Sequence, residues 1–105
     1  MELLERRILS EGEVLPGNVV KVGSFLNHQI DVSLLLEMGR EVNRLFSDAG
    51  VTKILTVEAS GIAIATAFAA VMGVPVLFAK KHGTSNLSGD MLSARTHSYT
   101  HNTDY

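Results

Sequence analysis

Residues 53–73 read KILTVEASGIAIATAFAAVMG, and this stretch decides the fold. Its apolar beginning, residues 53–57, is typical of a buried strand, and its alanine-rich end predicts a helix over about 62–72 that stops at Gly73. Between them, Glu58-Ala59-Ser60-Gly61 predicts a tight turn where backbone N–H groups and the helix dipole favour an anion. On position and pattern alone, a turn that carries Ser and Gly only for capping and geometry is an equally good interpretation.

The residues after Gly73 predict a second strand over 74–79, with Pro75 near its start. Both strands are nearly all apolar, as expected when both faces of a parallel sheet are covered. A strand, a helix and a strand in this order predict a parallel pair with a right-handed crossover. Ligands bind such sheets at the carboxyl ends of the strands, here residues 58–61 and Lys80-Lys81. The two lysines could reach the anion of the turn, although a lone lysine pair is most often a solvated strand end.

Upstream of the turn we expect two more helices. Residues 2–10 have helical spacing and end near Gly12, and residues 13–22 predict a turn-rich link and a short extended piece. Asp31 is an N-cap candidate for a helix that Gly50 would end. Its apolar stripe consists of Leu34, Leu35, Met38, Val42, Leu45 and Phe46. Asn27 and Gln29 carry amides that suit the edge of a heterocyclic base, but a capped turn is the simpler interpretation of this segment.

Composition restricts the function further. A chain of 105 residues with a net charge of −2 predicts one globular domain without the positive field typical of nucleic-acid binding. The absence of cysteine excludes disulfides and permits a reducing cytoplasm. The N-terminus has no signal-peptide pattern, and Gly73 and Pro75 argue against a membrane span in the uncharged residues 59–79. We identify no metal site, because His97 and His101 lack a third ligand, and no catalytic residue.

Three segments together resemble one known family. Residues 19–31 (VVKVGSFLNHQID), 52–63 (TKILTVEASGIA) and 74–82 (VPVLFAKKH) are similar to the N-terminal half of bacterial xanthine phosphoribosyltransferases, which are type I purine phosphoribosyltransferases. The resemblance implies an α/β fold with a parallel sheet flanked by helices, incomplete here. It divides this single partial domain, residues 1–105, into a purine-side hood (1–31), a core βαβ unit (32–81) and a long flexible loop (82–105).

The resemblance also implies roles for individual residues. Val20 and Asn27 would bind the purine, Glu58, Ala59, Ser60 and Gly61 would form the pyrophosphate loop, Lys80 and Lys81 would neutralise phosphate charge, and Ser98 and Tyr99 would lie in the flexible loop. The implied reaction is purine salvage, in which xanthine and 5-phosphoribosyl 1-diphosphate give xanthosine 5′-monophosphate and diphosphate. The resemblance further implies Mg²⁺ bound through the diphosphate, a homodimer, a cytoplasmic location, and no nucleic acid or membrane partner.

One departure from the family pattern is large. The family's acidic pair, which precedes the turn that grips the ribose and its 5′-phosphate, has no match, because no two acidic residues are adjacent in this chain. We therefore expect a truncated form that is inactive by itself. Two alternatives stay open: a non-catalytic remnant that binds purine and pyrophosphate or dimerises, and a phosphoribosyltransferase specific for adenine or guanine.

Overall fold

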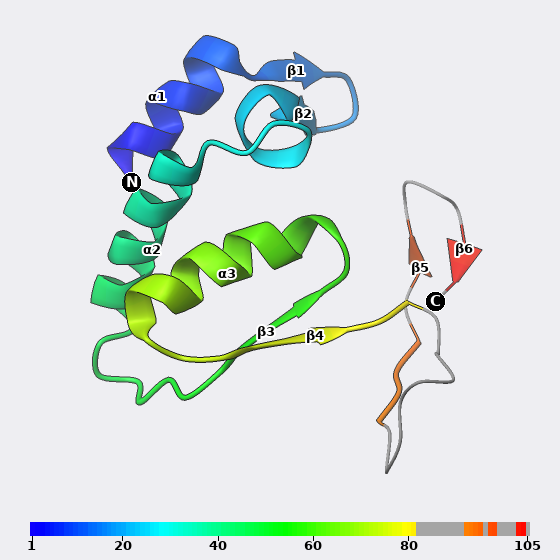
Figure 1. Cartoon of the computed structure of the whole chain (residues 1–105). Helices are drawn as coiled ribbons and strands as arrows, with labels where there is room; N and C mark the ends of the chain where they lie inside the picture. The colour runs from blue at the N-terminus through cyan, green and yellow to red at the C-terminus, as the bar shows by residue number, and fades with distance from the viewer. Residues whose placement is uncertain (82–91, 96, 99–102, 105) are drawn as a thin grey trace.

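The computed structural model describes residues 1–81, 92–95, 97–98 and 103–104, and Figure 1 shows their arrangement. The chain has mixed α/β structure, as the sequence predicted. In Figure 1, α3 lies between α2 and the strand pair β3–β4. Helix α1 and the hairpin β1–β2 lie near the N-terminal end of α2. The described elements are α1 (Glu2–Glu11), β1 (Glu13–Leu15), β2 (Val19–Lys21), η1 (Gly23–Asn27), α2 (Val32–Leu45), β3 (Ile54–Val57), α3 (Ser60–Met72), β4 (Val76–Ala79), β5 (His97–Ser98) and β6 (Thr103–Asp104).

The centre of the fold is the predicted βαβ unit. Strands β3 and β4 pair in parallel, with Ile54 opposite Val76 and Val57 opposite Ala79, and α3 connects them. Gly73 ends α3 with a φ of +71°, a left-handed conformation that glycine adopts without steric cost. Three boundaries differ from expectation: β3 begins at Ile54 rather than Lys53, α3 begins at Ser60 rather than near Ile62, and β4 begins after Pro75.

The prediction that both faces of this sheet are covered is wrong for the described residues. α3 packs against one face, where Ile54 and Thr56 are half-buried. On the opposite face Leu55 and Leu77, which pair across the strands, are 70% and 60% exposed. In the described part of the chain, the apolar residues on this opposite face are therefore exposed to solvent.

Helix α2 packs along α3, as its apolar stripe predicted. Leu34 and Leu35 are almost fully buried, and the buried Gly39 allows close approach because an added Cβ would lie 3.1 Å from a methyl group of Val71. The far end of the stripe is different. The helix ends at Leu45 rather than Gly50, and the side chains of Leu45 and Phe46 are exposed.

The N-terminal region contains a hairpin that the sequence analysis did not predict. Residues 13–15 were assigned to a turn-rich link, but they form β1, which pairs with β2 in antiparallel register with Val14 opposite Val20. Gly17 and Asn18 both have positive φ at the turn between the strands, a conformation that glycine and asparagine adopt most readily. The segment after β2, for which a capped turn was the simpler interpretation, contains the short π-helix η1.

The two last strands are short. β5 and β6 pair in antiparallel register, with His97 opposite Asp104 and Ser98 opposite Thr103. The searched part of the chain contains no helix with both the length and the hydropathy needed to cross a bilayer.

Candidate functional site

The turn after β3 and the residues after β4 lie together, as predicted for the carboxyl ends of parallel strands. Glu58 donates its backbone N–H to the carbonyl of Ala79 at 3.1 Å, which extends the ladder one residue beyond the strands. The backbone N–H of Lys81 donates in turn to Oε1 of the Glu58 carboxylate at 2.5 Å. The structure therefore brings residues 58–61 next to residues 80–81.

The turn itself is shorter than predicted. Glu58 and Ala59, joined by a cis peptide bond, are its only residues, and Ser60 and Gly61 already belong to the first turn of α3. In the described part of the chain, no side chain caps this end of α3, and its first turn holds no acidic residue. The first N–H groups of a helix lack the partners that later ones have, and they carry its positive dipole end. Among those of α3, the N–H of Ile62 donates to the carbonyl of Ala59 at 3.1 Å. This end can therefore accept an anion from outside.

Gly61 is required here for space rather than for a positive φ. A Cβ added at Gly61 would lie 2.3 Å from Oγ1 of Thr56, which is closer than non-bonded atoms come. Glycine therefore lets the first turn of α3 approach the end of β3. The sequence placed a glycine in the turn, but the contact with Thr56 depends on the packing of α3 against β3.

The two lysines have different surroundings. The Nζ atom of Lys80 lies 5.9 Å from the ring centroid of Phe78, within the range of a cation–π contact, and Lys80 is exposed. Lys81 is half-buried, and its backbone is fixed by Glu58. Two positively charged residues thus follow β4, and the end of β4 pairs with the strand that leads into the uncapped start of α3.

A second candidate region is a hollow of about 310 Å³ in the hood segment. Its lining combines apolar and polar groups and consists of Val20, Lys21, Val22, Gly23 and His28. Of the two predicted purine-binding residues, Val20 lines this hollow. Asn27 is the last residue of η1, and its side chain lies outside what the structure describes. The lining includes none of residues 58–61 or 80–81, so it forms a separate part of the site.

The shape of the hood depends on tight backbone bonding. The carbonyl of Gly23 accepts the N–H groups of His28 at 3.1 Å and Gln29 at 2.8 Å, which closes η1 on itself. The His28 ring then lies against Gly23, where an added Cβ would be 2.8 Å from its Cδ2 atom. Gly23 therefore lets the imidazole fold back to form one wall of the hollow.

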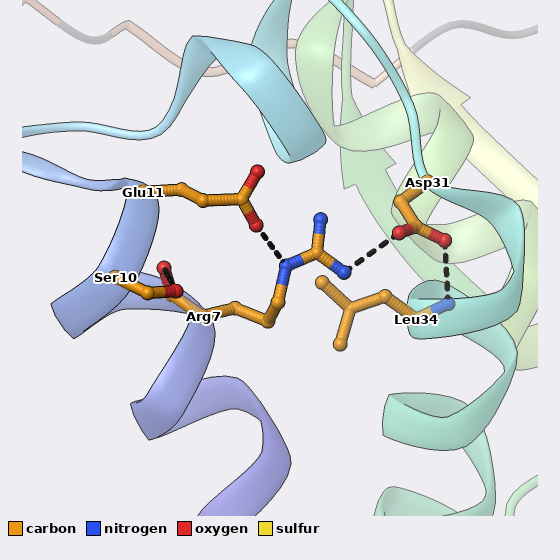
Figure 2. A network of polar contacts seen from close by, with 5 residues as sticks. All are labelled: Arg7, Ser10, Glu11, Asp31 and Leu34. Atoms are coloured by element: carbon orange, nitrogen blue, oxygen red, sulfur yellow. Dashed lines mark hydrogen bonds and ion pairs between the residues drawn. The ribbon is translucent and has the colours of Figure 1, made fainter.

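A polar network joins α1, within the hood, to the start of α2 (Figure 2). Arg7 pairs with Glu11 and, at 2.7 Å, with Asp31, whose other oxygen accepts the N–H of Leu34 at 3.1 Å and so caps α2 as predicted. The Arg7 guanidinium also lies 5.0 Å from the ring centroid of the fully buried Phe25 in η1. The role of Arg7 was not predicted, because partners 24 residues apart in the chain leave no local pattern.

The charged groups of this network shift one another's pKa values. The hydrogen bond from Arg7, followed by that from the Leu34 N–H, holds the pKa of Asp31 below its usual value. The same contacts act in reverse on Arg7, whose pKa is raised first by Asp31 and then by Glu11. Both side chains are about one-quarter to one-third exposed, at 26% and 32%, so solvent screens the pair in part.

The remaining predicted site residues lie near the end of the chain. Ser98 belongs to β5 and its partner in the ladder is Thr103. Tyr99 and most of the predicted flexible loop, residues 82–91, 96, 99–102 and 105, lie outside the described residues. The roles predicted for Ser98 and Tyr99 stay predictions.

The described residues offer no metal centre of their own. No group of three His, Cys, Asp or Glu side chains among them could hold a metal ion. Glu58, the acid nearest the uncapped helix end in sequence, accepts a hydrogen bond from Lys81. The N–H groups at the start of α3 are donors, which suits an anion rather than a cation.

The chain is similar to several known proteins that carry the same name. No family model matches the chain. A xanthine phosphoribosyltransferase of Pediococcus pentosaceus is 54% identical over 103 residues, which are 98% of this chain and 54% of that protein. The protein of the same name from Lactiplantibacillus plantarum is 55% identical over 98% of this chain and 53% of its own length. That from Clostridium novyi is 52% identical over all 105 residues and 55% of its own length. The chain thus spans about half the length of the curated relatives it matches, and the resemblance predicted from its sequence is confirmed.

Proposed function

This chain is a relative of the xanthine phosphoribosyltransferases, and we propose that its protein transfers a 5-phosphoribosyl group from 5-phosphoribosyl 1-diphosphate to xanthine. The products are xanthosine 5′-monophosphate and diphosphate, and the role is purine salvage. The fold assigned to the chain is that of part of a type I phosphoribosyltransferase domain, with a hood over residues 1–31, a βαβ core over 32–81 and a loop over 82–105.

The observation that supports this proposal most directly is the hydrogen bond of 2.5 Å between the Lys81 N–H and Glu58, which joins the chain after β4 to the turn before the uncapped start of α3. In the proposed site, diphosphate lies against the first turn of α3, where backbone N–H groups point at its oxygens. Lys80 and Lys81 neutralise part of its charge. As the bond from the sugar to diphosphate breaks, negative charge grows on the leaving oxygen, and donors fixed in advance stabilise it most at that stage.

We assign the purine to the hollow lined by Val20 and His28. Its volume of about 310 Å³ lies at the lower end of the usual range for ligand pockets. Val20 offers an apolar surface for the flat ring, and Asn27 is assigned a hydrogen bond to the purine edge on the basis of the resemblance. Bringing base and sugar together in one orientation lowers the entropic part of the barrier.

Mg²⁺ enters this proposal as part of the substrate. As the resemblance implies, the ion would come bound to the diphosphate oxygens, where it supplies positive charge. The protein residues act by binding and orienting the complex. We further propose that the protein is cytoplasmic and acts as a homodimer, as the resemblance implies. No nucleic-acid or membrane partner is assigned to it.

A direct assay tests the proposed reaction. The full-length protein, incubated with radiolabelled xanthine, 5-phosphoribosyl 1-diphosphate and Mg²⁺, should form labelled xanthosine 5′-monophosphate. Parallel reactions with guanine and adenine test the alternative specificity, and we expect xanthine to give the highest kcat/KM. Product with adenine or guanine alone would favour that alternative. Diphosphate binding without product from any purine would favour a non-catalytic binding protein.

A further inference from the structure

Glu58 stands at the proposed diphosphate site although its charge has the wrong sign for it. It is the first residue after β3, and the anion-binding end of α3 begins two residues later at Ser60. A carboxylate facing this site would repel diphosphate. The proposed function gives Glu58 a place in the loop, but it gives no reason for an acidic side chain there.

The contacts of Glu58 supply that reason. Its carboxylate accepts the N–H of Lys81 at 2.5 Å in a half-buried position, and its own N–H donates to Ala79 at 3.1 Å. The side chain thus joins the turn after β3 to the chain just beyond the end of β4, where the strand ladder no longer holds the backbone. A hydrogen bond to an ionised acceptor is roughly twice as strong as a neutral one.

We propose that Glu58 is a positioning residue that holds the Lys80–Lys81 segment against the diphosphate turn. It contacts no substrate. It fixes the backbone of Lys81, so that both lysine side chains start from one place beside the first turn of α3. This inference rests on the proposed function, since it names what keeps the phosphate-neutralising lysines in the same site.

Two substitutions of Glu58 distinguish a positioning role from an effect of its charge alone, because the two explanations predict different changes in diphosphate affinity. Glu58→Gln removes the negative charge but keeps an oxygen that accepts the Lys81 N–H, whereas Glu58→Ala removes both. If Glu58 acted through its charge alone, both variants would bind diphosphate more tightly. Positioning predicts that Glu58→Gln binds as tightly as the unaltered protein or up to about threefold more tightly, and that Glu58→Ala binds about tenfold more weakly.

The measurement is the affinity of the full-length protein for inorganic pyrophosphate by titration calorimetry, together with amide exchange at Lys81 by NMR. We expect faster exchange of the Lys81 amide in Glu58→Ala than in Glu58→Gln. Glu37→Ala is the matched control, because Glu37 is an exposed acid on α2 whose partner is Arg40, and its removal should change the affinity by less than twofold. Melting temperatures of all variants check that they fold.

Each outcome has one meaning. Equal or tighter binding by Glu58→Ala, with the Lys81 amide exchanging faster, would overturn the positioning role. An equal loss of affinity in both Glu58 variants would also overturn it, because Glu58→Gln keeps the oxygen that accepts the Lys81 N–H and should not lose affinity. Failure of the proposed function has a different signature: the unaltered protein binds pyrophosphate, and the two variants differ as predicted, but no purine is converted to a nucleotide.

Discussion

At the residue scale, the contact between Gly61 and Thr56 sets how closely α3 approaches β3. We predict that Gly61→Ala lowers the free energy of unfolding by about 1–3 kcal/mol, since its Cβ would lie 2.3 Å from Oγ1 of Thr56. Adding Thr56→Ala to Gly61→Ala should recover most of this loss, because the clashing oxygen is gone. Denaturant unfolding of the two single variants and the double variant measures the coupling.

The matched control for this cycle is Thr56→Val, which keeps an atom where the hydroxyl oxygen was. Combined with Gly61→Ala it should leave the protein destabilised. Additive effects of Gly61→Ala and Thr56→Ala would contradict the contact.

The pair of Arg7 and Asp31 predicts a dependence of stability on acid pH. The folded-state pKa of Asp31 is lowered, so its contribution is present above the unfolded-state value of about 3.9 and is lost as the pH falls through the folded-state value. Asp31→Asn should therefore lower Tm at pH 7, and the two proteins should converge as the pH falls below the unfolded-state pKa of Asp, about 3.9. Thermal unfolding at pH 7 and at lower pH values is the measurement.

Glu37→Gln is the control for this comparison, since it breaks an exposed pair with Arg40 and should leave Tm at pH 7 nearly unchanged. A difference in Tm between Asp31→Asn and the unaltered protein that is the same at every pH would contradict the role given to the charge.

At the element scale, the sequence predicted the helices and strands whose formation depends mainly on neighbouring residues in the chain. The apolar strand, the turn and the alanine-rich helix at residues 53–73 were predicted because propensity and pattern agree there. The hairpin β1–β2 was missed although Gly17 and Asn18, whose positive φ values form its turn, are a local signal for a hairpin. The π-helix η1 and the bond between Glu58 and Lys81 have no local signature, because packing and partners distant in the chain create them.

Within helix α2, too, the sequence predicted only part of the structure. Its apolar stripe predicted the buried side correctly at Leu35, but the side chain of Leu45 is exposed. We predict that Leu35→Ala lowers the free energy of unfolding by about 2–5 kcal/mol. Leu45→Ala, the same substitution at a side chain that is 61% exposed, should change it by less than about 0.5 kcal/mol. Chemical denaturation measures both, and equal losses would contradict the assigned packing.

At the scale of the whole molecule, the described chain is an α/β unit with one open sheet face. Leu55, Val57 and Leu77 leave 51–70% of their surface exposed on that face. The relatives are about twice as long as this chain. The two halves of the proposed site nevertheless fall within the described residues: the hollow at Val20 and the anion turn beside Lys81.

The central claim is that the start of α3 and the two lysines bind diphosphate, and titration calorimetry with inorganic pyrophosphate tests it most directly. The full-length protein should bind, and Lys80→Ala and Lys81→Ala should each weaken binding about tenfold, because each removes a charge beside the anion. Lys53→Ala is the matched control: Lys53 directly precedes β3, at the opposite end of that strand, and its loss should change the affinity less than twofold. Absence of binding, or equal affinity in all three variants, would contradict the account.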